Sequence, residues 1–208
     1  MDDQHLITDL AALEALFGPV GEASRRKQVA TIPPVYRAVI EASPFAVLAT
    51  TGPGGLDASP RGDAPGFVQV IDERTLLLPE RRGNNRIDSL RNVLADPRVG
   101  LLFLVPGVDE TLRVNGRARI TVDPAVLGRC AVQGARPKCA LWIEVDEVFF
   151  QCGRALIRSS LWAPRAADAP RPVPTAGQML AALTEGTVGG ADYDAALPQR
   201  QRATLYAD

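Results

Sequence analysis

The chain has 208 residues, 46% of them hydrophobic, and a formal net charge of −1. This length supports one substantial hydrophobic core, so we expect a single domain with terminal arms. The balanced charge argues against a protein that coats nucleic acid. The first residues, MDDQHLITDL, form no basic leader, and no run approaches the roughly 20 apolar residues of a membrane span. We therefore expect a soluble, cytoplasmic protein that binds neither membrane nor nucleic acid.

The cysteine and histidine content restricts the chemistry further. The three cysteines, Cys130, Cys139 and Cys152, are odd in number and lack CxxC spacing, which argues against a disulfide framework and a structural zinc site. His5 is the only histidine, so histidine-dependent triads and metal sites lack their central residue. Cys152 is either a nucleophile or, without a histidine partner, a small buried apolar residue. We predict no metal site and assign no catalytic residue.

Two helices are predicted in an N-terminal arm over residues 1–43. Thr8 is a candidate N-cap for the first, which ends at Gly18-Pro19. Its apolar residues recur at helical spacing: Leu10, Leu13, Leu16 and Phe17. A basic connector, Ser24 to Lys27, precedes the second helix, which follows Pro33-Pro34. The inward residues of this helix are Tyr36, Val39 and Ile40. Both helices cover either the core of their own chain or a partner subunit.

Residues 44–162 alternate short apolar runs with turn signals. The predicted strands are Phe45 to Thr51, Leu56 to Arg61, Phe67 to Ile71, Thr75 to Leu78, Val99 to Val105, Leu112 to Val122 and Ala140 to Gln151. The run from Val99 to Val105 is continuously apolar, which predicts burial on both faces. A connecting helix is predicted over Pro124 to Val132. Six or seven strands with few helices between them favour a mainly β, antiparallel barrel with flanking helices over a doubly wound parallel sheet.

Residues 163–208 are predicted to be a Pro-rich linker and a C-terminal arm. Between Ala163 and Thr175, four prolines and four alanines leave no periodicity, which is typical of an extended linker. Short helices are predicted over Gln178 to Leu183 and over Ala191 to Leu205. Such an arm is suited to clasping a partner subunit.

Arginines concentrate between the fourth predicted strand and the helix after it. The segment Arg81 to Arg91, RRGNNRIDSLR, has four arginines and one acid. Asn85 is the predicted N-cap of this helix, Arg86 its first residue, and Asp96-Pro97 its end. Backbone N–H groups at a helix start, together with guanidinium groups, form a good phosphate site. The alternative is a capped surface helix with solvated arginines.

Four segments carry a resemblance to a known family. In order they are SPRGD, TLLLPERRGNNR, DSLRNVLADPRVGLLFLVPG and ETLRVNGRARI. They resemble the pyridoxamine 5′-phosphate oxidase-like flavoproteins, specifically their uncharacterised FMN-binding branch, over roughly residues 45–162. The resemblance implies a split β-barrel, a homodimer, and FMN bound at the subunit interface.

The function that the resemblance implies is that of an FMN-dependent oxidoreductase acting on an unidentified small molecule. The alternative is a non-catalytic protein that stores, carries or senses FMN. A split-barrel haem binder fits poorly, because the predicted barrel contains no histidine. The Arg/His substrate pattern of the true pyridoxamine phosphate oxidases is missing, so vitamin B6 oxidation is not assigned.

The resemblance also implies a set of cofactor-binding residues. They are Arg61, Gly62, Pro79, Glu80, Arg81, Asn84, Asn85, Arg86, Ser89, Thr111, Arg113, Arg158 and Trp162. Arg61 matches a strand-borne arginine near the FMN phosphate. The segment from Asn84 to Ser89 matches the phosphate segment, where the better-studied oxidases prefer lysine and serine.

The remaining predicted residues are implied to surround the flavin ring. The backbone of Pro79, Glu80 and Arg81 is implied to meet the pyrimidine edge, although ordinary turn chemistry also explains these residues. Thr111 and Arg113 are implied to reach the flavin from the partner subunit; for Arg113 the alternative is a solvated strand face. Arg158 and Trp162, in the element after the last strand, are implied to approach the ring or the substrate cavity.

Overall fold

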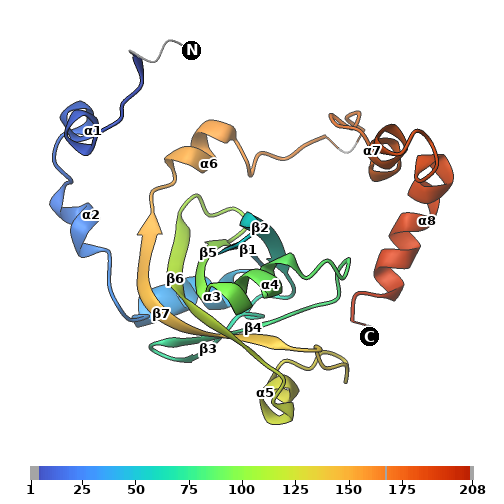
Figure 1. Ribbon diagram of the computed structural model, residues 1–208, viewed down its shortest axis with the longest axis horizontal. Coiled ribbons are helices and arrows are strands. Elements are labelled where there is room, and N and C mark those ends of the chain that lie inside the picture. The colour runs from blue at the N-terminus through green and yellow to red at the C-terminus, as the bar shows by residue number, and fades with distance from the viewer. Residues whose placement is uncertain (1–4, 167, 207–208) are drawn as a thin grey trace.

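The computed structural model describes residues 5–166 and 168–206. The start of the N-terminal arm, one linker position and the last two residues of the C-terminal arm lie outside the described residues. The chain forms an antiparallel seven-stranded sheet in the order β2-β1-β5-β6-β7-β4-β3, with flanking helices (Figure 1). The prediction of a mainly β, antiparallel fold with flanking helices is therefore confirmed.

The strands are β1 Phe45–Gly52, β2 Gly55–Gly62, β3 Gln69–Asp72, β4 Thr75–Pro79, β5 Arg98–Leu104, β6 Thr111–Thr121 and β7 Ala140–Gln151. The helices are α1 Leu10–Phe17, α2 Glu22–Arg26, α3 Pro34–Ala42, α4 Asp88–Ala95, α5 Pro124–Arg129, α6 Arg154–Ser159, α7 Ala176–Leu183 and α8 Gly190–Ala203. Every predicted strand is present, because each shows either period-2 alternation or a short apolar run between turn signals. The short helices α2 and α6 were not predicted.

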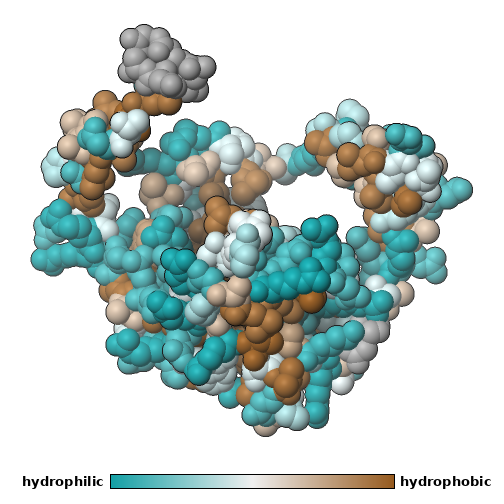
Figure 2. Space-filling model, viewed as in Figure 1, coloured by the Kyte–Doolittle hydropathy of each residue, from teal (hydrophilic) through white to brown (hydrophobic). Residues whose placement is uncertain are grey.

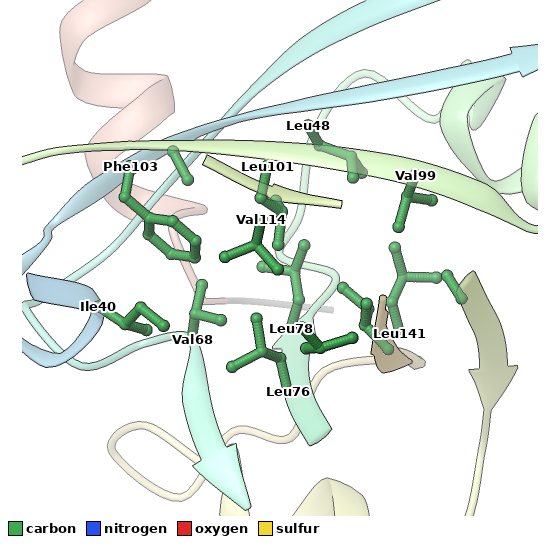
Figure 3. Packing of buried hydrophobic residues seen from close by; sticks show 14 of the residues in the cluster. Ile40, Leu48, Val68, Leu76, Leu78, Val99, Leu101, Phe103, Val114 and Leu141 are labelled. Carbon is green, nitrogen blue, oxygen red and sulfur yellow. The ribbon is translucent and has the colours of Figure 1, made fainter. Parts of the chain in front are cut away.

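The sheet is open. β2 and β3 are its edges, and within the described residues no ladder joins them, so barrel closure is not observed. Pro60 lies in β2 opposite Val47, and proline is tolerated there because an edge strand needs no N–H on its outer side. The sheet coils instead. In Figure 3, Leu48, Leu101 and Phe103 lie across the core from Val68, Leu76 and Leu78.

β5 corrects one prediction, that its apolar run is buried on both faces. Its burial alternates: Val99, Leu101 and Phe103 are buried, whereas Gly100, Leu102 and Leu104 are half-buried. The physical reason is that one face of the coiled sheet packs on the core, while the other face is only partly covered within a single chain.

The long strand β6 shows the predicted alternation. Leu112, Val114 and Ala118 are buried on the core face, whereas Arg117 and Arg119 are exposed on the other face. The ladder to β7 shifts register between Asn115 and Gly116, which marks a bulge.

The N-terminal helices differ from each other in how they pack. α3 begins at Pro34, the second residue of the predicted proline pair, buries Ile40 and packs Tyr36 and Val39 against the core. α1 is capped by Asp9 rather than by the predicted Thr8, because the Asp9 carboxylate accepts a hydrogen bond from the Ala12 N–H at 2.8 Å. α1 buries no residue, and Figure 2 shows apolar side chains on the surface of this arm. In the part of the chain that the structure describes, no helix is both long and apolar enough to cross a bilayer.

Candidate functional site

A cavity of about 930 Å³ lies beside the loop that joins β4 to α4. Its other walls come from β2, from the loop between α5 and β7, and from the C-terminal residues Leu205 and Tyr206. The predicted cofactor-binding residues that line it are Arg61, Glu80, Arg81, Asn84, Asn85, Arg86 and Ser89. Gly62 and Pro79 are chain neighbours of lining residues. The structure thus brings the predicted phosphate segment and the β2 arginine to one place.

Arg61 is at the centre of this cavity's polar network. Its side chain is only 14% exposed, and its Nη2 donates a hydrogen bond to Ser89 Oγ at 3.1 Å. The buried Ser89 hydroxyl in turn donates to Asp57 Oδ2 at 2.6 Å. Arg61 Nη2 also lies 3.3 Å from Glu80 Oε2. The two groups form an ion pair, but their geometry is not that of a hydrogen bond.

Two buried polar atoms of this network lack a hydrogen bond to any described residue: Arg61 Nε and Glu80 Oε2. Such atoms are costly to bury unpaired, and they are typical of sites completed by a ligand or by water. Burial raises the pKa of Glu80, and the neighbouring Arg61 lowers it by less. The Glu80 carboxylate is therefore a poorly solvated charge next to the buried Arg61 guanidinium.

The backbone N–H of Glu80 is occupied within the protein. It donates to the Cys139 carbonyl at 3.0 Å, since β4 pairs with β7 at Pro79 and Ala140. Proline has no N–H to offer. Of the backbone groups expected at the pyrimidine edge of a flavin, the Glu80 N–H is thus already used within the sheet.

The start of α4 corrects one expectation. The helix begins at Asp88 with Ile87 as its N-cap, so the predicted cap at Asn85 and the predicted first helical residue, Arg86, are wrong. Asn84 Oδ1 accepts from the Arg86 N–H at 3.1 Å, and Asn85 and Ile87 have φ angles of 60° and 53°. The asparagine side chain offers the backbone a local turn that competes with the helix. The helix therefore starts two residues later than predicted.

Arg86 consequently lies at the rim of the cavity. Its side chain is 73% exposed, and its Nε forms an ion pair with Asp88 Oδ2 at 2.8 Å. Exposed pairs of this kind contribute little to stability.

Arg81 is held by the protein itself. Its Nε donates to Asp63 Oδ2 at 2.7 Å and its Nη1 to the Cys130 carbonyl at 2.9 Å. Burial raises the pKa of Cys130, so this thiol stays protonated and unreactive. Arg81 thus fastens the β4–α4 loop to the residue after β2 and to the segment after α5.

The sequence interpretation missed two cations in the cavity wall, Arg136 and Lys138. Both are exposed, and the proline between them is buried, so the alternation turns both side chains outward at the cavity. Neither forms an ion pair with a residue in the described ranges. The signal was present in the sequence as a basic pair around Pro137, but nothing local connects this loop to residues 80–89.

The other predicted residues lie outside the cavity. Thr111 is buried and donates to Gln151 Oε1 at 3.1 Å, beside an apolar pocket of about 230 Å³ between α3 and β6. Arg113 pairs with Glu147 at 3.0 Å and lies 4.0 Å over the Phe149 ring, with its Nε unpaired.

Trp162 and Arg158 also lie away from the cavity, after the last strand. Trp162 Nε1 donates to the Val108 carbonyl at 2.8 Å, which tethers the segment after α6, while Arg158 is exposed in α6. Cys152 is exposed just after β7, so the alternative that it is a small buried apolar residue is wrong. A hydrogen bond from the Arg154 N–H lowers the pKa of its thiol.

Comparisons with known proteins found one matching family model and several similar solved structures. A search of curated proteins found no match. Similar solved structures include HupZ of Group A Streptococcus, with 20% identity and a TM-score of 0.47 over 58% of this chain and 99% of that one. A putative pyridoxamine 5′-phosphate oxidase from Lactobacillus delbrueckii has 18% identity and a TM-score of 0.44 over 58% and 99%. An FMN-binding protein from Syntrophomonas wolfei has 11% identity and a TM-score of 0.43 over 56% and 83%.

The family model described as pyridoxamine 5′-phosphate oxidase matches residues 32–152, which is more than half of the chain. The matched segment runs from just before α3 to the end of β7. It includes the cavity walls formed by β2, by the β4–α4 loop and by the loop before β7. The chain belongs to the pyridoxamine 5′-phosphate oxidase family.

Proposed function

We propose that this chain is an FMN-dependent oxidoreductase that acts on an unidentified small molecule. The observation that carries the proposal is the buried Arg61, which has an unpaired Nε and lies beside Ser89 in the first turn of α4. A guanidinium with unused donors next to a hydroxyl is suited to a phosphate. The cavity volume falls in the usual range for cofactor sites of about 300–1,000 Å³.

The charges around the cavity also support an anionic ligand. The lining cations are Arg61, Arg81, Arg82, Arg86, Arg136 and Lys138, and the lining carboxylates are Asp57, Glu80 and Asp88. In this proposal Arg61 and Ser89 hold the phosphate, and the Asn84–Arg86 turn closes around it. Arg136 and Lys138 face the ligand from the opposite loop. FMN, when bound, supplies the electron transfer.

The proposal includes a homodimer. Thr111, Arg113, Arg158 and Trp162 lie outside the cavity, so they would contribute to flavin binding only from a second subunit. The half-buried face of β5 and the apolar side chains of α1 are surfaces that a partner would cover.

The binding step is tested by titrating the ligand-free protein with FMN and following flavin fluorescence. Arg61→Ala should weaken FMN binding by roughly ten- to a hundredfold, because it removes a charge-assisted contact of about 1.5–3 kcal/mol. Riboflavin, which lacks the phosphate, should bind the parent protein far more weakly. Arg74→Ala is the matched control, since Arg74 is exposed in the β3–β4 turn and does not line the cavity.

Equal affinity for FMN and riboflavin, or an equal loss in the Arg61 and Arg74 variants, would remove the phosphate assignment. Catalysis is tested separately by anaerobic reduction of the bound flavin with NADH or NADPH, followed by a screen of acceptors. A flavin that binds tightly but is neither reduced nor reoxidised would identify a storage, carrier or sensor protein instead.

A further inference from the structure

The C-terminal end of the described chain returns to the cavity. In Figure 1, α7 and α8 stand away from the sheet, and the chain after α8 comes back beside the loop between β4 and α4. Leu205 and Tyr206 line the cavity there. The family model ends at residue 152, so this wall is built by a segment outside the matched part of the chain.

Tyr206 is attached to the cavity wall by a specific contact. Its hydroxyl donates to Asp63 Oδ1 at 2.6 Å, across 143 positions of sequence. The other Asp63 oxygen accepts from Arg81 Nε at 2.7 Å, and the Arg81 guanidinium carbon lies 5.6 Å from the centre of the Tyr206 ring. Asp63 therefore joins the C-terminal segment to Arg81.

The energetics of this contact favour a closed arrangement. The Asp63 side chain is only 3% exposed. Burial alone would raise the pKa of Asp63, but hydrogen bonds from Tyr206, the Ala64 N–H and Arg81 outweigh burial and lower it. Asp63 is thus an ionised acceptor, and hydrogen bonds to ionised groups are among the strong ones.

Within the described residues, few hydrogen bonds join the C-terminal arm to the sheet. α7 and α8 are fastened to each other through Asp194, which accepts from the Thr175 hydroxyl and from the Gly177 N–H. Among the described residues, the Tyr206–Asp63 contact is the one hydrogen bond between residues 176–206 and the chain before the linker. In the described chain, this contact holds the end of the arm at the cavity.

We propose that the segment Leu205–Tyr206 is a strap over the cavity, and that the Tyr206–Asp63 contact is the latch that retains the bound ligand. Tyr206 acts as a positioning residue: it holds Arg81 through Asp63 and blocks one way out. That the retained ligand is FMN rests on the proposed function; the latch itself does not. Opening the latch should speed both entry and exit of the ligand, with exit affected more.

The test compares Tyr206→Phe and Tyr206→Ala with matched changes at Tyr193. Tyr193 is also in the C-terminal arm, 4.7 Å from the Arg200 guanidinium carbon, but it does not line the cavity. Stopped-flow fluorescence measures the association and dissociation rate constants of FMN. Tyr206→Phe should raise the dissociation rate constant on the order of tenfold, as expected for one lost charge-assisted hydrogen bond. Tyr206→Ala should raise it further, and neither variant should slow association.

A ligand-free measurement separates this proposal from the FMN proposal. Trypsin cleavage after Arg200 and Arg202, followed by mass spectrometry, should be several-fold faster in Tyr206→Phe than in the parent and in Tyr193→Phe. If the parent binds no FMN but cleavage accelerates, the latch stands and the proposed function fails. If cleavage and FMN dissociation are unchanged in both Tyr206 variants, or change equally in the Tyr193 variants, the latch is wrong.

Discussion

Arg61 and Glu80 place two opposite charges side by side in the cavity, and the two would act on an anionic ligand in opposite directions. Arg61 is the donor that a phosphate would use, and Glu80 is its neighbour at 3.3 Å. Because burial raises the pKa of Glu80, the carboxylate is less stable there than in water. An incoming phosphate would compete with Glu80 for Arg61 and would be repelled by it. Glu80 is therefore expected to limit the affinity of the site for anions.

Glu80→Gln should bind FMN more tightly than the parent, by roughly tenfold, because a like charge beside the phosphate is removed. The gain should be largest at neutral pH and should shrink in acid, where Glu80 of the parent becomes protonated. Fluorescence titrations across pH measure this difference; comparing the two proteins cancels the titration of the phosphate itself. Glu73→Gln, an exposed acid away from the cavity, is the control. Weaker binding by Glu80→Gln would show that the carboxylate holds Arg61 in place instead.

The raised pKa of Glu80 also predicts how Glu80→Gln changes the free energy of unfolding with pH. A raised folded pKa means that the folded state favours protonated Glu80, so its stabilising contribution is fully present below the unfolded pKa, about 4.3. This contribution is lost as the pH rises through the raised folded pKa. Glu80→Gln should therefore increase the free energy of unfolding at pH 7 and be indistinguishable from the parent near pH 4. Urea denaturation at both pH values checks this sign, and a destabilised variant at pH 7 would contradict it.

At the scale of the elements, the bulge between β6 and β7 depends on one glycine. A Cβ on Gly116 would lie 2.2 Å from the Glu144 carbonyl oxygen, which is backbone and has no room to move. Gly128, in α5, has open space around the equivalent atom. Close packing therefore requires glycine at position 116 in the sheet but not at position 128 in α5.

Gly116→Ala should destabilise the protein by more than about 1 kcal/mol, because the two strands must separate or the bulge must reform. Gly128→Ala should stabilise it by about 0.5–1 kcal/mol, since alanine is the better helix former. Chemical denaturation of the two variants and the parent gives both values. An unchanged free energy of unfolding in Gly116→Ala would mean that the close approach at Glu144 is relaxed in solution.

At the scale of the whole molecule, the N-terminal arm is an apolar element without a core of its own. Leu10, Leu16 and Phe17 are exposed, Phe17 to 81%. An eight-residue helix is too short to persist alone in water, and α1 buries none of its residues within this chain. A second copy of the chain is the partner that the homodimer proposal supplies.

The parent protein should elute as a dimer in size-exclusion chromatography with light scattering. Replacing Leu10, Leu16 and Phe17 together by glutamine should shift the dimer towards monomer at low micromolar concentration, because it removes apolar contact area. Leu56→Gln, in the exposed β1–β2 hairpin, should leave the dimer intact. A parent that is monomeric throughout would reject the homodimer, and a dimer unaffected by the triple change would place the interface elsewhere.

The sequence by itself determined the strands and the residues at the centre of the cavity. β7 occupies the predicted residues 140–151, because alternation reports directly which side chains face a core. α3 begins at Pro34 for another local reason, because the fixed φ of proline suits the first position of a helix. The pairing of Arg61 with the 84–89 segment was implied by the family resemblance, and the structure brings these residues together.

Only the tertiary structure decided which loops meet around that centre. The pairing of β4 with β7 brings Glu80 to Cys139 and the loop with Arg136 and Lys138 to the cavity. Tyr206 meets Asp63 because the C-terminal arm returns to β2. The helix start moved from Arg86 to Asp88 because a local asparagine turn competed with the cap. Periodicity reports burial within one element, whereas strand order, register and chain return depend on contacts between residues far apart in sequence, which local patterns do not encode.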